Sequence, residues 1–147
     1  MVTLQDLFVF EKRGMDPDGK VVGRFAATGI RPKFYEKLLS AVADSDLREG
    51  EWQLCECTGW PDNPTAEQLL AWCWHANGRR HLVVVNLASG DAQARVRLPW
   101  SDLAGRTWHL RDALTGDTFD RDGGELGDEG LYVGMGPWQS YFLALVG

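Results

Sequence analysis

The chain has 147 residues, a net charge of −6 at neutral pH and seven tryptophans. This length suits a single domain with a sizeable hydrophobic core. The aromatic content argues against disorder, because one buried tryptophan removes roughly 150–250 Å² from water. The acidic balance argues against a surface for nucleic acids or anionic membranes, since such surfaces are normally basic.

Features that the sequence lacks bear on its location. It has no apolar run of about 18 residues, the length that a membrane-spanning helix requires. Its N-terminus has no basic segment followed by an apolar stretch, as a signal peptide would. Cys55 and Cys57 would share one face of a strand, which is a poor geometry for a disulfide between them. We therefore expect free thiols in a reducing compartment and a cytoplasmic location.

Residues 1–46 are predicted to form a hairpin and then a helix. In the hairpin, residues 1–30, the turn is Asp16-Pro17-Asp18-Gly19, in which Pro17 presets φ and Gly19 accepts a positive φ. The helix, residues 31–46, lies at the junction with the rest of the chain, and Pro32 suits its first turn. One broad face of this helix is apolar and requires a covering partner: Phe34, Tyr35, Leu38, Leu39 and Val42.

Residues 50–147 are predicted to form an antiparallel β-sandwich. Short apolar stretches alternate there with Gly- and Asp-rich turns, which is typical of that architecture. The expected fold class is mainly β (α+β), with an N-terminal β-hairpin, one amphipathic helix and the sandwich. The expected strands are residues 51–56, 69–76, 80–87, 93–98, 106–111, 131–134 and 138–146.

Asn77-Gly78 is the strongest hairpin signal, because a type I′ turn requires a positive φ at both central residues. With these two residues in the turn, His75 lies opposite Arg80 and Trp74 opposite His81. A hairpin that is apolar on both faces needs cover on both: the sandwich core on one, and the helix or a docking partner on the other. One face carries Leu70, Trp72, Trp74, Val83, Val85 and Leu87, and the other carries Ala71, Cys73, Leu82 and Val84.

The hydrophobic core is expected to draw on every predicted element. A buried tryptophan in it would be important, so that Trp72→Ala is expected to cost about 3–5 kcal/mol. The predicted core residues are Phe8, Phe10, Phe34, Leu38, Val42, Leu54, Leu70, Trp72, Trp74, Val83, Val85, Leu87, Val96, Leu98, Trp108, Leu110, Tyr132, Tyr141, Leu143 and Leu145.

Motifs for catalysis or for cofactor binding are missing. His75 and His81 fall on opposite faces of the hairpin, so we expect surface histidines rather than a metal site. Asp120, Asp122 and Gly123 lack the spacing of a calcium loop, and we interpret their region as an acidic loop surface. A phosphate-binding loop and a Gly-x-Ser-x-Gly elbow do not occur. The sequence thus predicts no catalytic, metal or nucleotide-binding residue, and no cofactor.

Two tryptophans remain as candidates for ligand contact. Trp60 in "TGWPDNPT" and Trp100 in "LPWSD" lie in Pro-containing loops, where an exposed ring could stack on a sugar. The alternative is that both rings anchor their loops by packing against the core.

The larger part of the chain, about residues 33–147, resembles the C-terminal β-domain of bacterial α-amylase-family glycoside hydrolases. The resemblance is carried, in the family's order, by "EGEWQLCECTGWPDNPT", "LLAWCWHANGRRHLVVVNLASGDAQARVRLPWSDLAGRTWHLRDALTGDTFDRDGGEL" and "LYVGMGPWQSYFLAL". It implies an antiparallel sandwich beside a catalytic (β/α)₈ barrel, with the catalytic residues on the barrel. It also implies that "FYEKLLSAVADSDLREGEWQL" corresponds to the last barrel helix leading into the sandwich.

The opening resembles a different family. Residues 2–38, "VTLQDLFVFEKRGMDPDGKVVGRFAATGIRPKFYEKL", are similar to the C-terminal end of the ATPases of type II/IV secretion and tight-adherence pilus assembly. The nucleotide-binding motifs of that family lie upstream of this stretch. The two resemblances together predict a chimeric chain joined within the helix.

The expected function is a non-catalytic accessory domain that supports a barrel and contacts glycan weakly. The alternatives are a protein-interaction or self-associating module that uses apolar hairpin and helix faces, and a recombined or designed chain without a native activity. The expected partners are a polysaccharide, a hydrophobic protein surface or a second copy of the chain, but no nucleic acid and no membrane.

Overall fold

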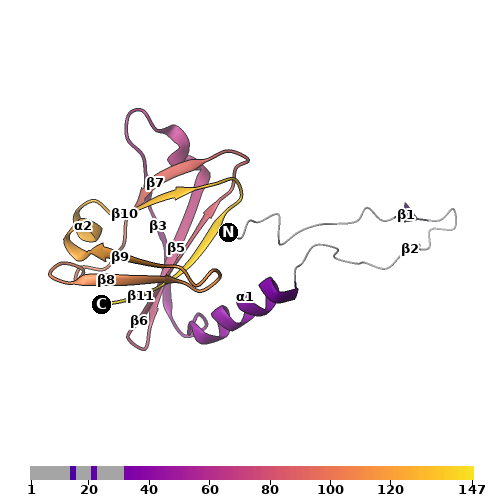
Figure 1. The fold of residues 1–147 in the computed structure, drawn as a ribbon, viewed down its shortest axis with the longest axis horizontal. Helices are drawn as coiled ribbons and strands as arrows, with labels where there is room; N and C mark the ends of the chain where they lie inside the picture. The colour runs from indigo at the N-terminus through magenta and orange to yellow at the C-terminus, as the bar shows by residue number, and fades with distance from the viewer. Residues whose placement is uncertain (1–13, 16–20, 23–31) are drawn as a thin grey trace.

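The computed structural model describes residues 14–15, 21–22 and 32–147, and is mainly β (Figure 1). Two antiparallel sheets pack face to face as a sandwich, and one helix, α1 (Pro32–Asp44), lies beside the larger sheet. The predicted fold class is confirmed. Among the described helices, none has both the length and the apolarity to cross a membrane.

The larger sheet has six strands in the order β3-β5-β6-β11-β8-β9, and all its pairs are antiparallel. The order is not that of the chain, because β11 inserts between β6 and β8. The strands are β3 (Glu51–Cys55), β5 (Leu69–Ala76), β6 (Arg79–Asn86), β8 (Thr107–Asp112), β9 (Thr118–Asp122) and β11 (Ser140–Val146).

The smaller sheet has three strands in the order β10-β7-β4: β10 (Leu131–Met135), β7 (Ala92–Val96) and β4 (Cys57–Thr58). The chain passes from one sheet to the other at Glu56, between β3 and β4. Two short helices complete the domain, the 3₁₀ helix η2 (Pro64–Gln68) and α2 (Gly123–Asp128). The sequence reading missed β4, β9 and both of these helices.

At the N-terminus, β1 (Gly14–Met15) pairs with β2 (Val21–Val22) in an antiparallel register. This pairing brackets the expected turn. The remainder of the predicted hairpin, with Phe8 and Phe10, lies outside the described residues.

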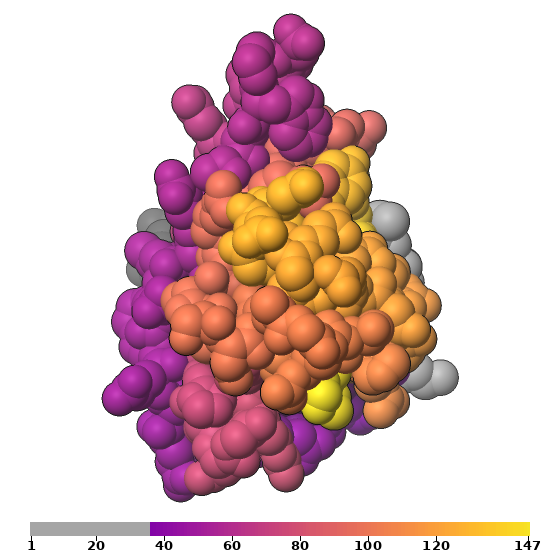
Figure 2. Space-filling view, turned by 90° about the vertical axis from the view of Figure 1, so that its left-hand side faces the viewer, coloured from indigo at the N-terminus to yellow at the C-terminus, as the bar shows by residue number. Residues whose placement is uncertain are grey.

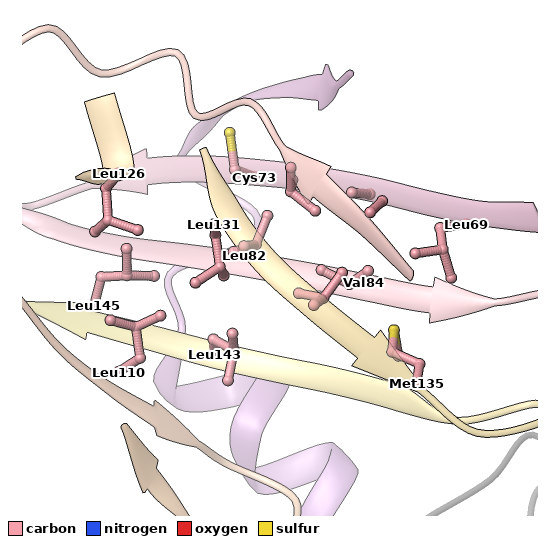
Figure 3. Close-up of a cluster of buried hydrophobic side chains, with 14 of the residues drawn as sticks. Leu69, Cys73, Leu82, Val84, Leu110, Leu126, Leu131, Met135, Leu143 and Leu145 are labelled. Carbon is pink, nitrogen blue, oxygen red and sulfur yellow. The ribbon is translucent and has the colours of Figure 1, made fainter. Parts of the chain in front are cut away.

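The predicted β5–β6 register is confirmed. Asn77 and Gly78 have φ values of 51° and 75°, and His75 pairs with Arg80 and Trp74 with His81. The two faces of this hairpin accordingly contribute to two separate buried clusters. The main cluster lies between the sheets and contains Ala71, Cys73, Leu82 and Val84 (Figure 3).

The second cluster lies between the six-stranded sheet and α1. Trp74, Val83, Val85 and Phe142 pack there with Ala41 of the helix, and Leu38 and Val42 flank them. The helix is therefore the element that covers the second apolar face of the hairpin, as one of the two sequence alternatives proposed.

Four predicted core residues are exposed instead. Leu54, Leu70 and Leu87 lie on the side of the larger sheet that faces α1, but α1 does not reach them. Tyr132 lies on the outer face of the smaller sheet. Trp72, Leu38, Val42, Leu98 and Tyr141 are half-buried, and the side chain of Phe34 lies outside the described part.

Candidate functional site

The structure separates the two tryptophans that the sequence singled out. Trp60 follows β4 and is 40% exposed. Trp100, between β7 and β8, is half-buried against the main cluster, and the Arg80 guanidinium lies 5.2 Å from its ring centroid. Trp100 is thus a packing residue, and Trp60 remains the candidate for ligand contact.

The neighbour of Trp60 is Tyr132 of β10, whose side chain is 42% exposed. Their ring centroids are 6.5 Å apart and the ring planes are inclined by 32°. The register brings them together, because Tyr132 pairs with Arg95 of β7, and Arg95 pairs with Thr58 of β4. We call Trp60, Gln93, Arg95 and Tyr132 the aromatic face. Figure 2 shows this side of the molecule, where the segment after β4 projects beside the β10 region.

Hydrogen bonds fix the aromatic face. The Tyr132 hydroxyl donates to Gln93 Oε1 at 3.1 Å. Asn63 N donates to the Trp60 carbonyl at 2.8 Å, and Asn63 Nδ2 donates to the Gln93 carbonyl at 2.8 Å. The loop that carries Trp60 is therefore tied to the sheet that carries Tyr132.

The charged groups around Arg95 carry a net negative charge. The Arg95 guanidinium contacts Glu125 Oε1 at 2.9 Å and Glu129 Oε2 at 3.0 Å, and it lies 5.6 Å from the Tyr132 ring centroid. Both nitrogens of this guanidinium thus contact carboxylates, and among the four residues of the aromatic face, all of them described, Arg95 is the one cation.

A groove of about 350 Å³ adjoins the aromatic face, where the edge strands β9 and β10 leave the sandwich open. Phe119 and Tyr141 contribute aromatic rings to it, with centroids 6.3 Å apart in an edge-on arrangement. Tyr132 lines this groove as well as the aromatic face.

A second exposed surface lies on the larger sheet. Trp52 and Leu54 of β3 are 66% and 63% exposed, and Leu70 of β5 is 40% exposed. Trp52 pairs with Trp74, and Leu54 with Trp72, so these side chains point to the side on which α1 packs. We call Trp52, Leu54 and Leu70 the apolar sheet face.

The histidines do not form a common site. His75 is exposed and His81 is on the opposite face of the hairpin, as predicted, but His81 is buried rather than at the surface. It is covered because α1 lies over that face. His109 Nδ1 lies 2.6 Å from Asp120 Oδ1 in an exposed pair. No group of three or more His, Cys, Asp or Glu side chains in the described part of the chain is arranged to hold a metal.

Asp120 and Asp122 are exposed, as the interpretation of their region as an acidic surface predicts, and some carboxylates between residues 112 and 130 also have structural roles. Asp122 is the N-cap of α2 and accepts hydrogen bonds from the backbone N–H groups of Gly124 and Glu125. Asp112 is buried, and burial raises the pKa of its carboxyl group. Asp120 and Asp122 lie in β9 rather than in a loop.

The three cysteines are free, as expected. Cys55 and Cys57 belong to different sheets, and both pack against the main cluster. The hydrogen bond to Cys73 and burial hold the pKa of the Cys55 thiol far above its usual value. Burial also raises the pKa of Cys57, so these two thiols stay protonated near neutral pH.

Comparison with solved structures identifies proteins with a similar fold. A noncanonic maltogenic α-amylase from Thermotoga neapolitana has a TM-score of 0.58 and 14% identity over 76% of this chain and 24% of its own. An Anoxybacillus α-amylase has a TM-score of 0.56 and 17% identity over 90% and 26%. A Geobacillus thermoleovorans α-amylase has a TM-score of 0.50 and 14% identity over 69% and 19%.

These similarities show that the β-sandwich fold of this chain also occurs in these α-amylases. The chain spans about a quarter or less of the length of each of these enzymes. No protein-family model matches the chain, and no curated protein sequence matches it significantly. The resemblance of residues 2–38 to secretion ATPases stays a prediction.

The sequence reading missed Tyr132 as a candidate site residue because it assigned that side chain to the core. Alternation in β10 gave a usable signal: Leu131, Val133 and Met135 are buried, while Tyr132 and Gly134 are exposed. Tyr132 therefore lies on the exposed face of β10, opposite the face that packs in the core.

Proposed function

We propose that this chain is a non-catalytic accessory β-sandwich domain of the amylase type, which packs against a larger catalytic body. The observation that carries the proposal is the apolar sheet face, with Trp52 and Leu54 exposed by 66% and 63% beside a helix that covers only part of the same sheet. Large apolar patches at the edge of a covered region are typical of interfaces.

Three features support this role. The structural neighbours are amylases that are about four times longer than their aligned parts. The helix α1 packs on the sheet through Leu38, Ala41 and Val42, and leaves Leu39 exposed by 51%. The segment from this helix into β3 resembles the last barrel helix of amylases leading into the sandwich. A barrel at this position would extend the cover that α1 begins.

The docking role can be tested by fusion. The chain, joined to the C-terminus of an α-amylase barrel that lacks its own sandwich, is expected to raise the thermal midpoint of the barrel. The variant Trp52→Ser/Leu54→Ser should lose this stabilisation. The matched control is Tyr132→Ser, which changes an exposed apolar residue on the outer face of the smaller sheet. Equal stabilisation by the wild type and the double variant would refute docking through this face.

Self-association is the alternative use of the same surface. If two copies bury their apolar sheet faces against each other, light scattering after gel filtration should report a dimer that the double variant abolishes. A monomeric wild type that does not bind a hydrophobic dye would count against any interface there.

The proposal also includes the absence of catalysis and weak contact with glycan through Trp60. Incubation of the purified chain with chromogenic glucosides and with ATP should give no turnover, and sustained turnover would refute the absence of catalysis.

The glycan contact has its own test. Isothermal titration of the chain with soluble starch should give weak binding heat. The Trp100→Ala variant should keep that binding, because Trp100 is half-buried under Arg80.

A further inference from the structure

We infer that a cavity between α1 and the larger sheet is a binding site for a small oxyanion of the sulfate or phosphate type. The cavity has a volume of about 330 Å³. Lys37 and Ser40 of α1 line it, together with His81 of β6 and Arg111 of β8. The inference goes beyond the proposed accessory role, because it assigns a ligand to a place that neither docking nor glycan contact uses.

The register of the larger sheet forms the floor of the cavity. Ala144 of β11 pairs with His81 on one side and with Arg111 on the other. Since neighbouring strands lie about 4.8 Å apart, roughly 10 Å separates the backbones of His81 and Arg111. The small side chain of Ala144 leaves the space between these two longer side chains unfilled. The helix covers this space with one face, on which Lys37 and Asp44 lie about two turns apart.

Cations outnumber carboxylates around this cavity. Lys37, Arg79 and Arg111 line it, and Asp44 is the one carboxylate among its described lining residues. Arg79 Nη1 lies 3.7 Å from Asp46 Oδ2 and donates to the Asp44 carbonyl at 2.8 Å. Lys37 Nζ donates to a backbone carbonyl at 3.5 Å, and no ion pair joins the Arg111 guanidinium to a carboxylate of the described residues. This local excess of positive charge would attract an anion.

His81 gives an independent indication of a ligand. It is 6% exposed and lines the cavity, yet its Nδ1 has no hydrogen-bond partner within the described part of the chain. Buried polar atoms are normally hydrogen-bonded, so an unpaired one indicates a partner that these residues do not supply. An oxyanion in the cavity offers acceptors to the imidazole as well as to Lys37 and Arg111.

The kinds of donor around the cavity select the ligand class. A guanidinium binds two oxygens of a sulfate or phosphate group at once, and an ammonium adds a compact charge with three donors. The Ser40 hydroxyl adds a neutral donor at the same cavity. Asp44 repels an anion, so we expect a weak, millimolar site. The free ion and the phosphate group of an ester share this chemistry.

The site is separate from the docking surface. The cavity lies against β6, β11 and β8, whereas the apolar sheet face belongs to β3 and β5 at the opposite edge of the six-stranded sheet. Failure of the anion test therefore leaves the outcome of the docking test unchanged.

The test is a titration of the full chain, labelled with ¹⁵N, with sulfate at an ionic strength held constant by chloride. The side-chain signals of His81 and Arg111 should shift. Arg111→Gln and Lys37→Gln should each weaken binding by about tenfold, the size expected for the loss of one hydrogen bond between charged groups. Asp44→Asn should strengthen binding, because it removes a carboxylate from the cavity. The matched control is Arg97→Gln, which removes an exposed cation that contacts the Asp128 carbonyl and should bind as the wild type does.

The pH dependence of binding tests the part played by His81. Burial and the neighbouring Arg79 lower the pKa of its imidazole, whereas Asp46 raises it. A bound dianion favours the imidazolium, so sulfate, which keeps its charge in this range, should bind more tightly as the pH falls from about 8 to about 6. His81→Phe should remove most of this change. The other charged groups that line the cavity, and so share its field, are Lys37, Asp44 and Arg111.

Thermal midpoints of all variants establish that they are folded. Glycerol 3-phosphate, titrated in parallel, distinguishes an ester from the free ion, and either ligand supports the site if it shifts the same signals. No shift at tens of millimolar of both ligands, wild-type affinity in Arg111→Gln, or an equal loss in Arg97→Gln would overturn the inference.

Discussion

Trp74 and His81 stack face to face across the β5–β6 hairpin, with ring centroids 4.9 Å apart and ring planes inclined by 10°. The Trp74 indole N–H donates to the Ser45 carbonyl at 2.8 Å, just after the end of α1, and the Phe142 ring meets the indole edge-on at 5.4 Å. This pair therefore joins the helix to the sheet beneath it.

The pair should make stability sensitive to pH. Burial lowers the pKa of His81, the neighbouring Arg79 lowers it further, and Asp46 opposes them. Among the described residues, His81 Nδ1 has no hydrogen-bond partner, so no hydrogen bond at that atom favours the imidazolium. As the pH falls below about 6.5, the unfolded chain takes up this proton before the folded chain does, and stability is lost.

Urea unfolding at about pH 7.5 and pH 5.5 measures this loss. The His81→Phe variant keeps an aromatic ring against Trp74 but cannot take up a proton, so its stability should fall less between the two pH values. The matched control is His75→Gln, which changes an exposed residue on the opposite face of the same strand pair and leaves His81 in place. If the stability of His81→Phe fell as much as that of the wild type between the two pH values, groups other than His81 would be responsible for the pH dependence.

Two tryptophans on paired strands should differ sharply in their contribution to stability. Trp74 is 1% exposed and Trp52, its cross-strand partner, is 66% exposed. We expect Trp74→Ala to destabilise the fold by about 3–5 kcal/mol, since it leaves a cavity in the second cluster and an unpaired Ser45 carbonyl. We expect Trp52→Ala to change stability by less than about 0.5 kcal/mol. Chemical denaturation distinguishes these outcomes, and similar losses would contradict the described burial.

Asp112 should tolerate removal of its charge but not of its acceptor. The carboxylate is 1% exposed and accepts from the N–H groups of Leu114 and Phe142 at 3.0 and 3.3 Å. Burial raises its pKa, so the charged form is the less favourable one in the folded chain. Its stabilisation is greatest at low pH and declines as the pH rises through the folded pKa.

At neutral pH, we expect Asp112→Asn to be as stable as the wild type or more so, because the amide oxygen can accept the same two hydrogen bonds. Asp112→Ala should lose about 1–3 kcal/mol, since it leaves buried donors unpaired. Thermal unfolding of both variants provides the comparison. A stability loss in Asp112→Asn as large as that in Asp112→Ala would show that the charge itself is required.

The β5–β6 hairpin was predictable because its register is set locally. Asn77 and Gly78 accept positive φ values, and once they occupy the turn, the side-chain alternation of both strands follows. The separation of the hairpin into two apolar faces was therefore available from sequence, and so was the need for a second covering element.

Which side chains on those two faces are exposed to solvent could not be predicted from the hairpin sequence. Leu70 and Val85 are cross-strand partners with similar hydrophobicity, yet Leu70 is 40% and Val85 8% exposed, because α1 packs over one and not the other. The placement of the helix is a tertiary relationship that strand alternation does not contain. Likewise, Trp60 meets Tyr132 only because β7 lies between β4 and β10, a pairing that brings distant segments together.

If the chain joins two ancestries, its N-terminal segment should contribute little to the stability of the sandwich. In the described structure, both buried clusters consist of residues from Leu38 onward, and the strands of the two sandwich sheets begin at Glu51. If residues 1–30 were joined to a domain that folds without them, their deletion should leave the thermal midpoint within a few degrees of the wild type, the shift expected for less than about 1 kcal/mol. Differential scanning calorimetry of the full and the shortened chain measures the shift of the midpoint.

The Trp74→Ala variant provides a destabilised reference in the same experiment. A large decrease of the midpoint on deletion would show that the N-terminal segment is part of the folding unit, and would contradict a simple attachment at the helix.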